Sequence, residues 1–240
     1  GRSMMQLFMG KYFMLIITLM LVYFAPVLGA EEDTDYEENV SEYEEILAKS
    51  VDSPFKYAEA QLDLGDAYLN LSKSGDKELN LNKAIRAYNE SLSVFTFENE
   101  PYNFAKIQSR LGYAYLALSE IKNKEINLNK AIDAFNESLR VFTLDDYPYD
   151  YANTQNNLGV AYRYLSQIRD KELNLNIAII CHNESLKVFD LEDSPYYYAE
   201  TMNNLGISYW GLSEVKDNES NLNRAIEALR ESLQVFTLED

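Results

Sequence analysis

Two adjacent residues of this sequence could carry catalytic chemistry: Cys181 and His182, the chain's single cysteine and single histidine. A cysteine nucleophile needs a base that removes its proton, and a histidine within hydrogen-bond reach usually serves. Neighbouring residues on a helix, however, point about 100° apart and do not face each other. The pair therefore lacks the geometry of a nucleophile with its base.

A repeat in the sequence gives both residues a structural explanation. Prolines stand at positions 54, 101, 148 and 195, and the glycine of a Leu-Gly pair stands at 65, 112, 159 and 206, so both series advance by 47 residues. In this register the cysteine takes a position that holds alanine elsewhere, and the histidine takes a position of large side chains. The equivalent residues are Ala87, Ala134 and Ala228 for Cys181, and Tyr88, Phe135 and Leu229 for His182. We therefore expect both residues in the core.

The sequence has no other motif for catalysis or for a cofactor. It contains no glycine-rich phosphate loop, no pair of cysteines, no His-x3-His and no calcium-binding loop. Its many carboxylates fall on the polar faces of predicted helices and on their connections. We therefore expect a protein that is not an enzyme, with no catalytic residue, no metal site and no cofactor.

The charge of the chain is strongly negative. Its 240 residues include 21 Lys and Arg against 39 Asp and Glu, which gives a net charge of −18. Such a surface repels the phosphates of nucleic acids, so we expect no nucleic-acid partner. The charge fits either solubility or a basic protein partner. A single cysteine forms no disulfide within the chain, so it gives no information about the redox compartment.

Residues 54–240 divide into four repeats, each predicted to be a helix–turn–helix unit. The repeats cover residues 54–100, 101–147, 148–194 and 195–240. A proline opens the first helix of each, where its missing N–H costs nothing, and apolar residues recur with helical spacing in both helices. A polar connection ends at an asparagine that we expect to cap the second helix: Asn80, Asn127, Asn174 and Asn221. No segment alternates with a period of two, so the predicted fold is all-α.

This pattern resembles the tetratricopeptide repeat (TPR), whose signature joins Trp-x2-Leu-Gly-x2-Tyr to a later alanine, aromatic residue and alanine. The first half is matched by Leu64-Gly65-x-x-Tyr68, Leu111-Gly112-x-x-Tyr115, Leu158-Gly159-x-x-Tyr162 and Leu205-Gly206-x-x-Tyr209. The second is matched by Ala84…Tyr88, Ala131…Phe135, Ala178…His182 and Ala225…Leu229. Glutamine or methionine replaces the tryptophan, serine replaces the last alanine, and each repeat exceeds the usual ~34 residues. The resemblance is to a long, prokaryotic-type repeat and covers residues 54–240.

The resemblance implies a right-handed α-solenoid whose concave groove binds a protein or a peptide. Related repeats line the groove with first-helix residues around the Leu-Gly site, and an asparagine just before Leu-Gly holds the ligand's backbone; Asn157 and Asn204 match that position. The basic clamp by which some members hold C-terminal carboxylates is not recognisable. The implied groove residues are Lys106, Ser109, Arg110, Tyr113, Leu116, Asn153, Asn156, Asn157, Val160, Arg163, Tyr164, Glu200, Asn203, Asn204, Ile207 and Trp210.

The groove positions vary between repeats, which fits a binding surface and equally fits drift at free surface positions. Trp210 is the sharpest case, because its equivalents Leu69, Leu116 and Arg163 show that the core needs no indole there. We expect it to anchor a ligand; the alternative is packing on the next repeat or on another copy. The expected function is non-catalytic binding of a protein segment. The alternative is a structural scaffold that self-associates through the outer face of its fourth repeat.

The N-terminal segment has the pattern of an export signal. Arg2 and Lys11 flank an unbroken apolar stretch over residues 12–24, and Val27-Leu28-Gly29 offers small residues to a signal peptidase. We expect residues 1–30 to be a signal peptide or, at the short limit of a membrane span, an uncleaved anchor. Membrane contact is expected only in the second case. Both alternatives place the repeats outside the cytoplasm.

Residues 31–45 are too acidic and too poor in apolar residues to fold alone, so we expect an acidic tether there. Residues 46–53 resemble the end of a second helix, and we expect them to form a capping half-repeat. Six Asn-x-Ser sequons fit an extracytoplasmic, glycosylated protein or arise by coincidence, since three of them are the same repeat position. They begin at Asn39, Asn70, Asn89, Asn136, Asn183 and Asn218.

Overall fold

The computed structural model describes residues 32–50 and 52–236. The chain divides into two compact units, Gly1–Asp35 and Tyr36–Asp240, and the second unit contains all four repeats. The expected signal peptide or anchor over residues 1–30 lies outside the described residues and stays a prediction. Among the helices that are described, none has the length and hydropathy needed to span a membrane.

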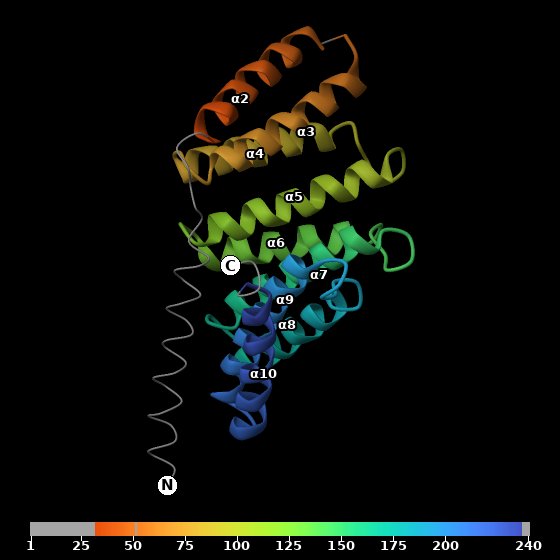
Figure 1. Cartoon of the computed structure of the whole chain (residues 1–240). Coiled ribbons are helices and arrows are strands. Elements are labelled where there is room, and N and C mark those ends of the chain that lie inside the picture. The colour runs from red at the N-terminus through yellow and green to blue at the C-terminus, as the bar shows by residue number, and fades with distance from the viewer. Residues whose placement is uncertain (1–31, 51, 237–240) are drawn as a thin grey trace. The chain divides into compact units, whose positions relative to one another are not determined.

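The described residues form helices and no strands, so the predicted all-α solenoid is confirmed. The helices are α2 (Glu32–Lys49), α3 (Pro54–Leu71), α4 (Lys77–Leu92), α5 (Pro101–Ser119), α6 (Lys124–Ser138), α7 (Pro148–Leu165), α8 (Lys171–Ser185), α9 (Pro195–Ser213) and α10 (Asn218–Phe236). From α3 onward they pack as antiparallel pairs, one pair to each repeat. The second helix of each pair also packs on the first helix of the next (Figure 1).

A glycine in each first helix lets the two helices of a pair approach closely. A methyl group added at Gly65, Gly112 or Gly159 would lie 2.5 Å from the ring of the facing residue, which is Tyr88, Phe135 or His182 respectively. In the fourth repeat the same construction at Gly206 lies 2.7 Å from Leu229. These distances are too short for a real side chain, so each Leu-Gly site needs its glycine.

The prediction that Cys181 and His182 are core residues is confirmed. Cys181 is 5% exposed, and His182 is fully buried against Gly159 in the place that Phe135 takes against Gly112. Burial raises the pKa of the Cys181 thiol to about 12, so the sulfur is protonated at neutral pH. A buried thiol of this kind is inert as a nucleophile.

The serine that replaces the last alanine of the TPR signature has a packing role. Ser91, Ser138, Ser185 and Ser232 are fully buried. The hydroxyls of Ser91 and Ser232 each donate to a first-helix carbonyl, that of Ala58 or Ala199, at 2.7 Å. The same serine completes the sequons at Asn89, Asn136 and Asn183. Packing therefore explains the repeated sequon without glycosylation.

The predicted N-caps of the second helices are wrong. These helices begin earlier, after Asp76, Asn123 and Asp170, so the expected caps lie inside the first turn. There the amide groups of Asn127, Asn174 and Asn221 each donate at 2.8 Å to the carbonyl five residues earlier, and that of Asn80 reaches Leu71 O at 3.5 Å. These asparagines fasten the turn between the helices. Asn123 and Asp170 adopt a φ of 47°, which their short polar side chains tolerate.

Helix α2 differs from the prediction for the region before the first repeat. It runs unbroken from Glu32 to Lys49, whereas the sequence predicts a tether over residues 31–45 and a half-repeat from residue 46. Val40, Tyr43 and Leu47 form an apolar stripe along it that packs on the core of the first repeat. The Tyr68 hydroxyl also donates to Glu44 Oε1 at 2.7 Å. Contact with α3 thus orders a segment that we expect not to fold alone.

We call the turn between the first and the second helix of a repeat its elbow. Ion pairs join the elbow regions of consecutive repeats. Each pair takes one partner from the start of a second helix and the other from the end of the next first helix. The pairs are Lys77–Glu120 and Lys122–Glu78, then Arg169–Glu125, and then Lys171–Glu214 and Lys216–Glu172. About half of each side chain is exposed, so each pair contributes little to stability. Their value is to match each repeat to its neighbour.

Candidate binding groove

The first helices of all four repeats contribute to two cavities that share lining residues. The larger has a volume of about 410 Å³ and the smaller about 250 Å³. Lys73, Tyr113, Asn157 and Glu200 line both cavities, and they come from the first elbow, α5, α7 and α9. We call the surface formed by the two cavities the groove.

Most of the residues that the TPR resemblance implies line this groove. They are Ser109, Arg110, Tyr113, Leu116, Asn153, Asn157, Val160, Arg163, Tyr164, Glu200 and Asn204. Several come from α7, whose half-buried Asn153 and Asn157 stand one turn apart and face the same way. The Asn157 amide donates to Asn153 Oδ1 at 3.4 Å. The two amides thus form a pair on the groove wall. Their mutual bond leaves the Asn157 oxygen, one hydrogen of the Asn157 nitrogen and both hydrogens of the Asn153 nitrogen outside it.

Five expected groove residues line neither cavity: Lys106, Asn156, Asn203, Ile207 and Trp210. Asn156 is only 3% exposed, and its side-chain oxygen contacts His182 Nδ1 at 3.1 Å and accepts from the Asn204 amide at 3.3 Å. It therefore belongs to a buried polar network. Trp210 is half-buried on α9, although its equivalents Leu69, Leu116 and Arg163 line the cavities in the first three repeats.

Residues in and beside the elbows also line the groove, and the TPR resemblance does not predict them. Ser72 and Lys73 come from the first elbow, Lys77 from the first residue of α4, and Glu120 from the second elbow. Asp66 was missed as well, although it shares the repeat register of Tyr113 and Val160, both expected in the groove. The register was therefore a usable signal for Asp66. For the elbow residues no signal existed, because their position depends on how far the repeats curve toward one another.

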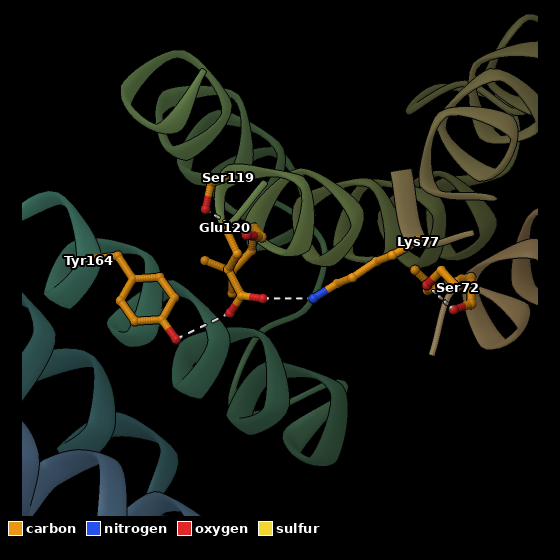
Figure 2. A network of polar contacts seen from close by, with 7 residues as sticks. Ser72, Lys77, Ser119, Glu120 and Tyr164 are labelled. Atoms are coloured by element: carbon orange, nitrogen blue, oxygen red, sulfur yellow. Dashed lines mark hydrogen bonds and ion pairs between the residues drawn. The ribbon is translucent and has the colours of Figure 1, made fainter. Parts of the chain in front are cut away.

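The groove contains two ion pairs, and in each of them the two opposite charges neutralise each other. Lys77 Nζ lies 2.8 Å from Glu120 Oε2, and Arg110 Nε lies 3.2 Å from Asp66 Oδ1. Figure 2 shows Glu120 between Lys77 on one side and the Tyr164 hydroxyl on the other; the hydroxyl donates to Glu120 Oε1 at 3.4 Å. These contacts hold the groove wall in shape and leave little free charge at either pair.

Arg163 and Glu200 are the less compensated charges of the groove. The guanidinium of Arg163 lies 4.7 Å over the Tyr164 ring, its Nε is buried without a hydrogen-bond partner, and burial lowers its pKa. Burial disfavours the charged form of Glu200 as well, and for a carboxyl group this raises the pKa. Tyr113 lines both cavities with Glu200, and Tyr196 precedes Glu200 by one turn of α9. Burial first and the Glu200 charge second raise the pKa of both tyrosine hydroxyls. Water is thus partly excluded from this part of the groove.

The groove offers amides, aromatic rings and a few desolvated charges. Within the described part of the chain, no three His, Cys, Asp or Glu side chains gather as a metal site would require. The only described histidine is buried, and burial lowers its pKa to about 3. Such a set of side chains suits the recognition of a peptide backbone and its side chains.

Comparison with known proteins shows which solved structure has a similar fold. No protein-family model matches the sequence, and no curated protein matches it either. Among solved structures, the crystal structure of MamA, a TPR-like helical repeat protein, superimposes with a TM-score of 0.56 at 17% sequence identity. The match covers 87% of this chain and 93% of MamA. The likeness shows that the chain has the TPR-like helical repeat fold.

Proposed function

We propose that this protein is an interaction module that binds an extended segment of another protein in the groove. The observation that carries the proposal is the convergence of α3, α5, α7 and α9 on the two cavities, so that residues from the first and fourth repeats line one site. A surface shared by four repeats suits a long ligand. Binding would be passive, since it needs only the preformed shape.

The asparagine pair of α7 is the proposed contact with the ligand's backbone. An amide donates to a carbonyl and accepts from an N–H at once, so Asn153 and Asn157 can follow a peptide whatever its side chains. Asn204 lines the larger cavity but already donates to Asn156 Oδ1. We therefore assign Asn204 to shaping the groove and the α7 pair to contact with the ligand.

A selection experiment tests this proposal. Peptides that bind the immobilised protein are selected from a phage-displayed library of random twelve-residue sequences. We expect the selected peptides to bind an Asn153→Ala/Asn157→Ala variant about tenfold more weakly than the wild type, because two backbone contacts are lost. The measurement is fluorescence polarisation with labelled peptides.

The matched control is an Asn82→Ala/Asn223→Ala variant, which removes two exposed amides from the second helices α4 and α10. It should bind like the wild type. Equal loss in both variants, or no selection of peptides at all, would contradict binding in the groove. Unchanged circular dichroism of both variants shows that any loss does not come from unfolding.

Self-association through the outer repeats is the weaker candidate, because the elbow pairs are not repeated there. The positions equivalent to Glu120 and Lys122 are Lys73 and Gly75 in the first elbow, and the position equivalent to Lys171 is Asn218 in the fourth. A second copy stacked end to end would therefore not find the ion pairs that join neighbouring repeats. This difference favours binding of another protein over stacking of identical chains.

We further propose that the protein acts outside the cytoplasm, supported by the charge, length and small-residue pattern of residues 1–30. We expect the protein recovered from its own host to begin at or near Ala30, because Val27-Leu28-Gly29 suits a signal peptidase. N-terminal sequencing measures this. Recovery of chains that retain the apolar stretch over residues 12–24 would rule out cleavage and favour the membrane anchor.

A further inference from the structure

Glu200 is the carboxylate of the groove that has no cation beside it. It lies in α9, is half-buried, and lines both cavities. The groove's other carboxylates, Asp66 and Glu120, are held by Arg110 and Lys77. Among the ion pairs formed by the described residues, none includes Glu200.

Two cations that line the groove with Glu200, Lys73 and Arg163, make their contacts with other residues. Lys73 lines both cavities with Glu200, but its ammonium group donates to Asn70 Oδ1 at 3.1 Å. Arg163 lines the larger cavity and stacks on Tyr164. Neither cation forms an ion pair with Glu200, and burial raises the pKa of the Glu200 carboxyl. The chain therefore leaves this carboxylate desolvated and uncompensated, an arrangement that costs free energy until a cation arrives.

Two tyrosines complete the surroundings of Glu200. Tyr113 comes from α5 and Tyr196 from α9, and both rings are substantially exposed. Tyr113 lines both cavities with Glu200, and Tyr196 stands four residues before Glu200, on the same face of α9. The Glu200 charge raises the pKa of each hydroxyl, after the larger effect of burial. Tyrosine faces attract ammonium and guanidinium groups, and their apolar surface accommodates the alkyl chain of lysine or arginine.

We propose that Glu200, with Tyr113 and Tyr196, forms a subsite that receives one lysine or arginine side chain of the bound protein segment. This inference rests on the proposed function, because it specifies the ligand of the same groove. A cationic side chain supplies the charge that Glu200 lacks, and the net charge of −18 draws basic segments toward the protein. An acidic or purely apolar segment would leave the carboxylate buried and unpaired.

The test uses the same random peptide library, with Glu200→Gln compared against Glu214→Gln. Each substitution removes one negative charge, so the overall attraction for basic peptides changes equally. Glu214 pairs with Lys171 at an elbow and lines neither cavity. We expect peptides selected on the wild type to share a lysine or arginine at one position. Their dissociation constants should rise about tenfold for Glu200→Gln and less than about twofold for Glu214→Gln.

A second measurement replaces that lysine or arginine in a selected peptide by norleucine. The replacement should weaken binding to the wild type about as much as Glu200→Gln does, and should have little further effect on the variant, because both changes remove the same ion pair. Basic peptides that bind Glu200→Gln as tightly as the wild type would overturn the subsite and trace the preference to overall charge.

Selected peptides without a shared basic residue would overturn the subsite as well, while binding that depends on Asn153 and Asn157 would still support the proposed function. If no peptide is selected, or if selected peptides ignore the asparagine pair, the proposed function fails and the subsite fails with it. Glu200→Gln removes an unpaired, desolvated carboxylate, so its melting temperature should not fall below that of the wild type. Weaker binding by this variant would thus not come from unfolding.

Discussion

Replacing Gly112 by alanine is expected to lower the free energy of unfolding by about 2 to 3 kcal/mol, although alanine is the better helix former. The new methyl group would lie 2.5 Å from Cδ1 and Cε1 of Phe135, a fully buried ring in α6. A ring packed on all sides has no free rotamer to escape to, so α5 and α6 must separate. Urea unfolding followed by circular dichroism measures the loss.

Gly211→Ala is the matched control, because this glycine also lies inside a first helix. A methyl group there would lie 3.2 Å from Cδ2 of Leu175, a contact that a shift of a few tenths of an ångström relieves, whereas the 2.5 Å contact with Phe135 requires a much larger one. We expect a change within about 1 kcal/mol, in either direction, since helix propensity then offsets the tighter contact. A Gly112→Ala variant as stable as Gly211→Ala would show that helix spacing does not depend on the Leu-Gly site.

The repeat register was sufficient to predict the arrangement of the helix pairs. Position 182 could be assigned to the core because three other repeats place a large residue there, and the structure buries the histidine against Gly159. The same reasoning placed the starts of the first helices at prolines, where α3, α5, α7 and α9 begin. Four copies of one pattern average out local exceptions, so features shared by all copies are predictable.

Features that depend on one contact rather than on the pattern were not predictable. Asn127 is a good helix cap by residue type, yet its amide is used to close the elbow onto Lys122 O. The first 14 residues of the α2 helix read as a solvated tether, because the surface that orders them belongs to α3 and α4. In both cases the deciding partner lies outside the segment being read.

The groove was predicted in part, for a geometric reason. First-helix residues on either side of the Leu-Gly pair, such as Asn157 just before it and Val160 just after it, line the groove as expected. Asn156 is one residue away from Asn157 on the helix and so points about 100° aside, into the buried network with His182. Trp210 has the right register but belongs to the fourth repeat, where neither cavity extends to that position. Register selects a face of the helix, and the position along the array decides whether that face meets a cavity.

The free energy of unfolding falls between pH 8 and pH 5, and replacing His182 by phenylalanine is expected to make this fall smaller by about 2 kcal/mol. Burial, followed by the charge of Arg163, lowers the pKa of His182 to about 3 in the folded protein, against about 6.5 in an unfolded chain. Between these values the unfolded chain binds a proton that the folded protein does not. The contribution of His182 to stability is therefore complete above pH 6.5 and is lost progressively as the pH falls toward 3. Phenylalanine has no such equilibrium.

The comparison is clean because His182 is the chain's single histidine, and the many carboxylates are common to both proteins. At pH 8 the variant should equal or exceed the wild type in stability. A phenylalanine ring already packs against the equivalent glycine in the second repeat, where Phe135 faces Gly112. The substitution also removes the buried Nε2 of His182, which has no hydrogen-bond partner, and it loses the contact of His182 with Asn156. Urea unfolding at both pH values should thus show the advantage of the variant growing as the pH falls. An advantage that does not change with pH would mean that His182 is open to protonation in the folded protein, and that the buried network of Asn156 and Asn204 does not exclude water from the core.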